Sequence, residues 1–269
     1  MPHVEVDGRR LHYVRQGEGE PLLLIQGMSA NHLHWGDDFL GLLREDFDLI
    51  AYDHRGIGHS GRVGEPFTIS ELADDARGLL DALELESVHV MGISMGGMVA
   101  QELALAHPER VRTLTLGCTY CGGEGSRSTD AEIVQRLGEL FLTGRTDEAL
   151  RYGFAVNVSP AFAQDPAHYE QVTRIAAELP ASLDILMLQM QAIAAHDTSE
   201  RLPGLAVPTL VIHGSEDQML PADNGRMIAD LIPGARLEVL QDVGHAFWWE
   251  RPEQVAQMLR EHAATAAPA

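Results

Sequence analysis

The chain of 269 residues contains no lysine, because all 19 of its basic residues are arginine. A mechanism that depends on lysine, such as a Schiff base or a P-loop, is therefore excluded. The 40 Asp and Glu residues outnumber the arginines and give a formal net charge of −21. Phosphate groups are bound by local positive charge, so we expect no nucleic acid and no anionic membrane among the partners. The expected partner is a small-molecule substrate.

Long apolar runs are also missing, since none approaches the roughly 18 residues that a membrane-spanning helix needs. The first residues, 1–7, lack the basic segment followed by an apolar one that is typical of a secretory signal. We therefore expect a cytoplasmic protein that does not associate with membranes. The sequence leaves the oligomeric state open between monomer and homodimer.

Cysteine is scarce, and the two that occur, Cys118 and Cys121, form a C-x-x-C. A redox dithiol normally opens a helix, whereas this pair follows an apolar run and leads into two glycines. One C-x-x-C also supplies too few ligands for a structural zinc site. His32 and His34 are expected at the surface or at a pocket rim, because the sequence shows no cluster of further metal ligands around them. We therefore predict no cofactor and no metal.

Short apolar runs alternate with amphipathic helical patterns along most of the chain. The runs that favour strands lie at residues 9–16, 22–25, 47–52, 88–93, 111–116, 208–213 and 235–240. Helical patterns lie at residues 35–44, 68–83, 98–106, 222–231 and 252–262, and the second of these begins at a capping box, Thr68 to Glu71. This alternation predicts a mostly parallel, doubly wound sheet that is covered by helices on both faces.

The alternation stops in the middle of the chain, where only helical patterns occur. They lie at residues 131–142, 146–154, 166–178 and 182–196. We therefore predict an α/β core formed by residues 1–122 and 200–269, with a helical cap formed by residues 123–199. An insertion that follows the carboxyl end of a strand is placed to cover a site at that edge of the sheet.

The strand pattern at residues 88–93 ends in Gly92-Ile93-Ser94-Met95-Gly96, which matches G-x-S-x-G. A serine at the tip of a sharp strand-to-helix turn has a strained backbone, so its neighbours at −2 and +2 must lack bulk. Its hydroxyl then stands beside the first free N–H groups of a helix. The motif therefore makes Ser94 a candidate nucleophile.

Nucleophilic catalysis by serine needs a base and a carboxylate that orients the base. Asp217 lies just after the strand pattern at 208–213, and His245 lies just after the pattern at 235–240. Each candidate therefore follows the end of a separate strand. The chain order Ser94, Asp217, His245 is that of the α/β-hydrolase triad. Glu216 and Asp242 are rival carboxylates, but they fit the motif position less well.

Five motifs together resemble those of the α/β-hydrolase-fold enzymes. They are the strand-end Gln26-Gly27-Met28, the loop Tyr52-Asp53-His54-Arg55-Gly56-x-Gly58-x-Ser60, the turn Gly92-Ile93-Ser94-Met95-Gly96-Gly97, the loop Gly214-x-x-Asp217, and Gly244-His245 with Glu250-Arg251-Pro252. The similarity covers nearly the whole chain and is greatest to small bacterial esterases and enol-lactonases. It implies the α/β-hydrolase fold, with the helical cap inserted after the sixth strand.

The resemblance also implies roles for individual residues. Ser94 would be the nucleophile, His245 the general base and then acid, and Asp217 the carboxylate that fixes the imidazole tautomer. The backbone N–H groups of Met28 and Met95 would form the oxyanion hole. The chain departs from many relatives at Gln26, where they carry histidine, so substrate contacts are expected to differ there.

The remaining candidates concern the wall of the pocket and the loop after the strand at 47–52. The predicted wall comprises Gln26, Gly27, Cys118, Phe154, Met187, Met190 and Trp248. At helical spacing, Phe154 and the two methionines fit the core of the insertion better than the substrate wall. His54, Arg55 and His59 are expected to have a structural role.

A serine nucleophile excludes the epoxide hydrolase and haloalkane dehalogenase branches, which need a carboxylate at this position. The expected enzyme is a carboxylic ester hydrolase that cleaves an ester or lactone of a small to medium, largely apolar substrate through an acyl-enzyme. A methyl esterase is a narrower version of this prediction. The alternatives are a C–C bond hydrolase or a cofactor-free perhydrolase of the haloperoxidase type. A non-catalytic ligand-binding receptor is a further alternative from a different class.

Overall fold

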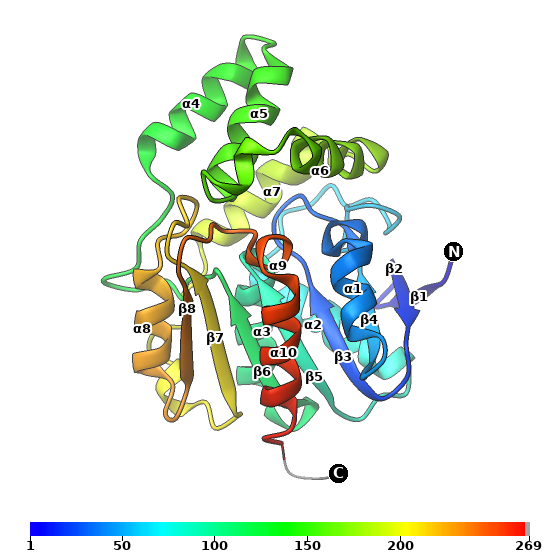
Figure 1. The fold of residues 1–269 in the computed structure, drawn as a ribbon. Helices are drawn as coiled ribbons and strands as arrows, with labels where there is room; N and C mark the ends of the chain where they lie inside the picture. The colour runs from blue at the N-terminus through cyan, green and yellow to red at the C-terminus, as the bar shows by residue number, and fades with distance from the viewer. Residues whose placement is uncertain (267–269) are drawn as a thin grey trace.

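The computed structural model describes residues 1–266, in which a single eight-stranded sheet separates two layers of helices (Figure 1). The strands are β1 (His3–Val6), β2 (Arg9–Gln16), β3 (Glu20–Ile25), β4 (Phe47–Tyr52), β5 (Val88–Ile93), β6 (Val111–Gly117), β7 (Thr209–Gly214) and β8 (Arg236–Leu240). Their order across the sheet is β1-β2-β4-β3-β5-β6-β7-β8. Pairs β1–β2 and β2–β4 are antiparallel, and the other five pairs are parallel. The predicted doubly wound, mostly parallel sheet is confirmed.

The central strands are apolar at successive positions because helices cover both of their faces. β5 and β7 are buried at every residue. One face packs on α2 (Ile69–Ala82), α3 (Met95–Ala106) and α8 (Asp223–Leu231), and the other on α1 (Asp37–Leu43) and α10 (Pro252–Ala263) (Figure 1). The core thus consists of two apolar layers, one on each face of the sheet. Together they hold the parallel strands in place, so that these strands end along one edge of the sheet.

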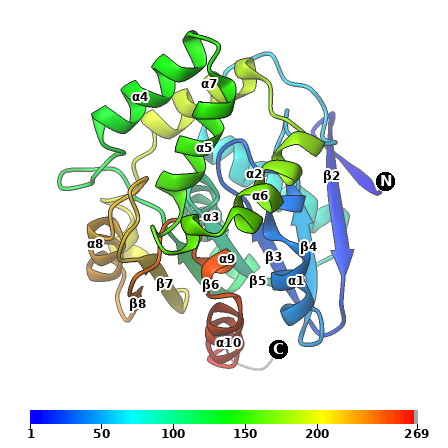
Figure 2. The same ribbon diagram turned by 45° about the horizontal axis from the view of Figure 1, so that its top comes forward.

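Four helices lie between β6 and β7 in the sequence and stand over the carboxyl ends of the parallel strands (Figures 1 and 2). They are α4 (Ala131–Leu142), α5 (Thr146–Asn157), α6 (Pro166–Glu178) and α7 (Leu183–Ala194). Here they are called the insertion helices. The carboxyl ends of the parallel strands therefore lie beneath the insertion helices.

Most predicted elements agree with the structure to within a few residues, and the capping box is present. The Thr68 side chain accepts from the Glu71 N–H, and the Glu71 carboxylate accepts from the Thr68 N–H. The sequence patterns missed β1, α9 (Phe247–Glu250) and short 3-10 helices such as the one at His32–Trp35. β1 has four residues and lies at the edge of the sheet, so its alternation is too short to recognise. With β1 included, the strand before the insertion helices is the sixth.

Within the part of the chain that the structure describes, no helix has both the length and the apolar character needed to cross a bilayer.

The buried histidines lead to a prediction about pH. His196 follows α7, is 6% exposed, and has no hydrogen-bond partner on either ring nitrogen. Burial lowers the pKa of His196 from its ordinary value of 6.5 to about 4. Between these pH values the unfolded chain binds a proton that the folded chain does not, so the group costs stability as the pH falls.

Replacing His196 with phenylalanine should remove this cost. The free energy of unfolding of His196→Phe should fall less steeply between pH 6.5 and 4, by up to about 1.4 kcal/mol per pH unit. Urea unfolding across this range measures the difference. His3→Phe, at an exposed histidine, is the control that should retain the wild-type slope. An unchanged slope in His196→Phe would contradict the prediction.

Candidate active site

Ser94 lies at the sharp turn between β5 and α3, and the turn depends on backbone atoms in close contact. Its φ of 53° and ψ of −124° are a strained combination for a residue with a side chain. A Cβ on Gly92 would lie 2.2 Å from the Gly96 carbonyl oxygen, and one on Gly96 would lie 2.1 Å from that of Ile25. Only glycine fits at either position, and this explains why the G-x-S-x-G pattern has a glycine on each side of the serine.

Two hydrogen bonds to the Ser94 main chain hold its strained conformation in place. The Ser94 N–H donates to the Gly117 carbonyl at 2.9 Å, and the Ser94 carbonyl accepts from the Thr119 hydroxyl at 2.7 Å. Both partners belong to β6 or to the residues just after it. These bonds hold the conformation while the half-buried side chain reaches a cavity above the sheet.

Asp217 and His245 meet at the ends of the next two strands, β7 and β8. The His245 Nδ1 lies 2.8 Å from Asp217 Oδ2, whereas Glu216 is half-buried and Asp242 is exposed, and neither forms such a bond. The other carboxylate oxygen, Oδ1, accepts the N–H groups of Met219 and Leu220, both at 2.9 Å. The structure therefore brings Asp217, rather than its two rivals, to the histidine.

A second histidine supports the same carboxylate. The His213 Nε2 lies 3.2 Å from Asp217 Oδ2 and 2.7 Å from the Leu220 carbonyl oxygen. Burial of the carboxylate opposes its ionisation, but the two imidazoles outweigh burial and hold the pKa of Asp217 well below its ordinary value. Asp217 is therefore an anion at neutral pH. A carboxylate in that state fixes His245 with its Nδ1 protonated, which leaves Nε2 as the basic nitrogen.

The loops that carry Asp217 and His245 are joined backbone to backbone. A Cβ on Gly214 would lie 2.2 Å from the Gly244 carbonyl oxygen. The N–H groups of Ser215 and Glu216 donate to the carbonyls of Leu240 and Val243, both at 2.9 Å. The relative position of the two side chains is therefore set by main-chain packing.

Through its carboxylate, Glu250 joins the histidine loop to the segment after α5. Its Oε1 accepts the N–H groups of Gly244 at 2.8 Å and Ser159 at 2.9 Å, and its Oε2 accepts the Ser159 hydroxyl at 2.5 Å. The Ala246 N–H donates to the Asn157 carbonyl at 2.8 Å. Hence both chain neighbours of His245 are tied directly or indirectly to the end of one insertion helix.

The cavity between the sheet edge and the insertion helices has a volume of about 350 Å³, and Ser94 and His245 both line it. Its upper wall consists mainly of apolar side chains from α4 to α6, among them Leu137, Phe141, Leu150 and Ile175. Its polar members include Gln26, Ser29, His34, Asn157 and Thr173. No arginine lines the cavity in the part of the chain that the structure describes.

Several of the predicted pocket residues line this cavity and others do not. Gln26, Gly27, Phe154 and Trp248 line it, as does Met28. Met187 and Met190 do not; they are 58% and 46% exposed. The buried residues of α7 are Ile185, Gln189 and Ala192. Because α7 is apolar on more than one face, its sequence alone could not show which side is covered.

The thiols lie away from the cavity surface. Cys118 is fully buried beside Asp217 and His245 and does not line the cavity. Burial, with a smaller effect of Asp217, raises the pKa of Cys118 well above its ordinary value. Burial likewise raises the pKa of Cys121 to about 11. Neither cysteine is therefore a thiolate at neutral pH. The thiolate is the form that redox exchange and metal binding need.

The loop residues after β4 have structural contacts. The His54 Nε2 lies 2.9 Å from the Gln26 carbonyl oxygen, and the Arg55 Nε donates to Asp75 at 2.6 Å. His32 differs from the expectation, because it does lie in a cluster of possible metal ligands, with His12 and Asp53. The prediction of no such cluster was wrong because β2, β4 and the segment after β3 bring together residues that are far apart in the sequence.

Comparison with known proteins identifies the family of this chain. Residues 22–258 match the model of the alpha/beta hydrolase family. The chain belongs to the alpha/beta hydrolase family.

Similar proteins are named as different kinds of hydrolase. The proposed carbamate hydrolase RutD of Azorhizobium caulinodans is 32% identical over 96% of this chain and 97% of that protein. The 2-hydroxymuconate semialdehyde hydrolase of Pseudomonas sp. strain CF600 is 31% identical over 93% of this chain and 88% of that protein. The solved structure of the enol-lactonase from Burkholderia xenovorans LB400 has a TM-score of 0.83 at 27% identity, covering 98% of this chain and 100% of that one. Family membership therefore indicates a hydrolase and leaves the bond to be argued from the site.

The sequence missed two residues that organise this alpha/beta hydrolase site, His213 and Ser159. His213 is the penultimate residue of β7 and looked like part of an apolar run. Ser159 follows α5 with no motif around it, so only the fold shows that it meets Glu250. Glu250 itself belonged to a recognised motif, although its contacts could not be read from the sequence.

The turn at Ser94 gives a stability prediction. In Gly96→Ala the added Cβ would lie 2.1 Å and 2.5 Å from the Ile25 and Gln26 carbonyl oxygens, which are backbone atoms and cannot rotate away. We expect the free energy of unfolding to fall by about 1 to 3 kcal/mol or more. The matched control is Gly138→Ala in α4, where nothing lies within 4 Å of the added atom.

The control Gly138→Ala should raise the free energy of unfolding by about 0.5 to 1 kcal/mol, because alanine leaves the unfolded chain fewer backbone conformations than glycine does. Equilibrium unfolding in urea measures both variants. Equal effects of the two substitutions would contradict the close packing described for Gly96.

The Glu250 contacts give a second prediction. Glu250→Ala leaves the buried Gly244 and Ser159 N–H groups without an acceptor, at a cost of about 1 to 3 kcal/mol each. The amide hydrogens of Gly244 and Ala246 should then exchange faster with solvent, which hydrogen-exchange mass spectrometry or NMR detects. Glu253→Ala, at an exposed position in the first turn of α10, should lower stability by no more than about 1 kcal/mol and leave the exchange of these amides unchanged. Unchanged exchange in Glu250→Ala would show that the contact does not hold the histidine loop.

Proposed function

We propose that this alpha/beta hydrolase is a serine esterase or lactonase that acts on a small to medium, uncharged and largely apolar substrate through an acyl-enzyme. The observation that carries the proposal is the position of Ser94 and the Asp217-bound His245 in the wall of one apolar cavity. In this proposal Ser94, His245 and Asp217 form a catalytic triad.

The first chemical step follows from the protonation state of His245. With Nδ1–H donated to Asp217, the lone pair of His245 Nε2 is free to remove the Ser94 hydroxyl proton. The Ser94 oxygen then adds to the substrate carbonyl carbon, and the carbonyl oxygen becomes an anion. His245 afterwards gives the proton to the departing alcohol oxygen, which leaves an ester of Ser94. A water activated by the same histidine attacks this ester and restores the free serine.

Two backbone donors are proposed to bind the anionic oxygen. Met95 is the first residue of α3, so its N–H has no acceptor within the helix. Met28 lies in the turn after β3 and lines the cavity. The positive end of the α3 dipole adds to the attraction for negative charge at this point. Removing one such donor typically costs about 2.7 to 4 kcal/mol of transition-state stabilisation.

The electrostatics of the cavity favour a neutral substrate. Burial lowers the pKa of the lining residue His34 to about 4, so this imidazole is uncharged at neutral pH. The two polar residues of the upper wall are engaged locally, since the Asn157 amide donates to Gly153 and the Thr173 hydroxyl to Tyr169, both at 2.7 Å. With no arginine in the described lining and a net charge of −21, a carboxylate-bearing substrate would find no counter-charge.

Active-site labelling tests the proposed nucleophile. A fluorophosphonate probe should label the wild-type protein and Ser29→Ala, but not Ser94→Ala. Ser29 is the matched control because it offers a second hydroxyl side chain in the same cavity wall. The kcat for a neutral p-nitrophenyl ester should fall about 10⁶-fold in Ser94→Ala. Labelling that persists in Ser94→Ala would refute the proposed nucleophile.

A substrate profile then separates the bond types. Neutral esters and lactones should be hydrolysed faster than analogues that carry a carboxylate. Faster cleavage of a vinylogous diketone acid would instead favour the C–C hydrolase class, and peroxide with acetate tests perhydrolysis. Tight ligand binding without any turnover would favour a receptor.

A further inference from the structure

The loop after β3 begins with a tight turn that carries Met28, the residue proposed to supply one oxyanion donor. The Ala30 N–H donates to the Gly27 carbonyl at 3.4 Å, so residues 27–30 form a β-turn. A Cβ on Gly27 would lie 3.0 Å from the Ser94 Cβ and 3.5 Å from its Oγ. The turn therefore lies directly against the proposed nucleophile, and any shift of the turn changes the position of Met28 relative to Ser94.

The third residue of this turn has a strained backbone. Ser29 has a φ of 65°, whereas Met28, the second residue, does not have a positive φ. This combination is typical of a type II turn, and glycine adopts the third position far more readily than serine does. In the commoner type I turn the peptide between the second and third residues points the opposite way, and both residues have unstrained angles. A contact that holds this peptide therefore stabilises the type II form.

The contact comes from α7, one of the insertion helices. The Ser29 N–H belongs to the peptide between the second and third residues, and it donates to Gln189 Oε1 at 2.9 Å. Gln189 is fully buried, on the same covered side of α7 as Ile185 and Ala192. The bond joins residues 160 positions apart, so the form of the turn depends on how α7 packs over the edge of the sheet.

The Gln189 side chain forms no other hydrogen bond in the described chain. Its Nε2 is buried and has no partner there. A buried amide group without a hydrogen bond costs free energy, and an apolar side chain of similar size would avoid that cost. What the glutamine supplies at this position is the acceptor for the Ser29 N–H.

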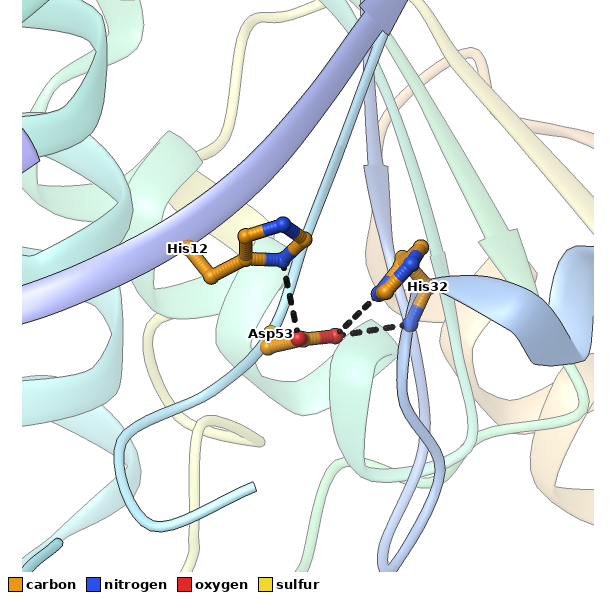
Figure 3. A group of neighbouring side chains, drawn as sticks. All are labelled: His12, His32 and Asp53. Atoms are coloured by element: carbon orange, nitrogen blue, oxygen red, sulfur yellow. Dashed lines mark hydrogen bonds and ion pairs between the residues drawn. The ribbon is translucent and has the colours of Figure 1, made fainter. Parts of the chain in front are cut away.

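The rest of the loop is held at two further points. The Asn31 Nδ2 donates to the carbonyl of Leu179, just after α6, at 3.1 Å. The His32 N–H and the His32 Nδ1 lie 2.8 Å and 2.9 Å from Asp53 Oδ1, and Figure 3 shows His12 of β2 on the other oxygen of the same carboxylate. The far end of the loop is thus fixed to the sheet, whereas the turn at its start is held by the insertion.

We propose that Gln189 is a positioning residue, which holds the Ser29 N–H and thereby fixes the turn of Met28 in the geometry that the oxyanion hole needs. This inference rests on the proposed function. Oxyanion donors contribute to catalysis because they are fixed in place before the charge develops. Gln189 does not line the cavity, so it acts through the turn and not on the substrate.

Steady-state kinetics of the full-length protein test this role. Gln189→Met removes the acceptor and nearly keeps the volume, so kcat for a neutral p-nitrophenyl ester should fall about tenfold to a hundredfold, which is less than the loss of a whole donor. The kcat/KM should fall by the same factor, because the interaction acts in the transition state. Gln191→Met, at an exposed position on the same helix, is the matched control and should keep the wild-type kcat. An unchanged kcat in Gln189→Met, or a rise in KM alone, would overturn the proposal.

Two further measurements separate positioning from a general loss of structure. Gln189→Glu retains an acceptor oxygen at the same reach, so it should recover most of the kcat that Gln189→Met loses. Phenylboronic acid forms a tetrahedral adduct with a serine hydroxyl, and its inhibition constant should rise in Gln189→Met by the factor by which kcat/KM falls. Circular dichroism checks that each variant is folded. A folded Gln189→Glu variant without recovery, or an unchanged inhibition constant in Gln189→Met, would contradict the positioning role.

Hydrogen exchange tests the contact without reference to catalysis. The Ser29 amide hydrogen should exchange faster with solvent in Gln189→Met than in the wild type, while the Ser94 amide, which donates to Gly117, should keep its protection. If a fluorophosphonate does not label Ser94 in the wild type, the proposed function fails and the positioning role fails with it. If Ser94 is labelled and the exchange of Ser29 is unchanged in Gln189→Met, only the positioning role is wrong.

Discussion

The geometry of the site depends on three segments of backbone that touch where β3, β5 and α3 meet. Gly92, Gly96 and Ile25 approach so closely that no Cβ fits on either glycine. This contact forces the turn that displays Ser94, and it sets the first turn of α3 beside the loop of Met28. A flexible serine loop would not fix the proposed nucleophile and the two proposed oxyanion donors relative to one another. A similar close contact between main chains occurs at Gly214 and Gly244, and it holds the loop of Asp217 against that of His245.

The insertion helices do more than cover the cavity, because one of them is bound to the histidine loop. The end of α5 accepts the Ala246 N–H, and Ser159 shares the Glu250 carboxylate with Gly244. A displacement of α5 would therefore be transmitted to the backbone on both sides of His245. The wall of the cavity and the proposed base are therefore joined by backbone contacts, which link the shape of the cavity to the position of His245.

The sequence predicted the sheet, the insertion and the meeting of Asp217 with His245 because each depends on a local pattern. Strand ends follow from apolar runs, and parallel strand ends share an edge, so motif residues just after them converge. It could not predict which side of α7 is buried, since Met187 and Met190 repeat as regularly as Ile185 and Gln189. Nor could it predict contacts such as Ser159 with Glu250 or His12 with Asp53, which join residues 91 and 41 positions apart. Such contacts depend on the packing of elements and have no signature in either segment alone.

The chain uses one arrangement twice, and the difference between the two copies is what the free nitrogens face. Asp217 and Asp53 are both fully buried carboxylates that bind two imidazoles and two backbone N–H groups. At Asp217, His245 lines a cavity that the strained Ser94 also lines, which is the arrangement that the proposed proton transfer needs. At Asp53 the rings of His12 and His32 lie beside a third imidazole, that of His59, and none of the three lines the cavity. The same arrangement therefore orients a histidine at the cavity in one place, and in the other it ties β2, the segment after β3 and the loop after β4 to one carboxylate.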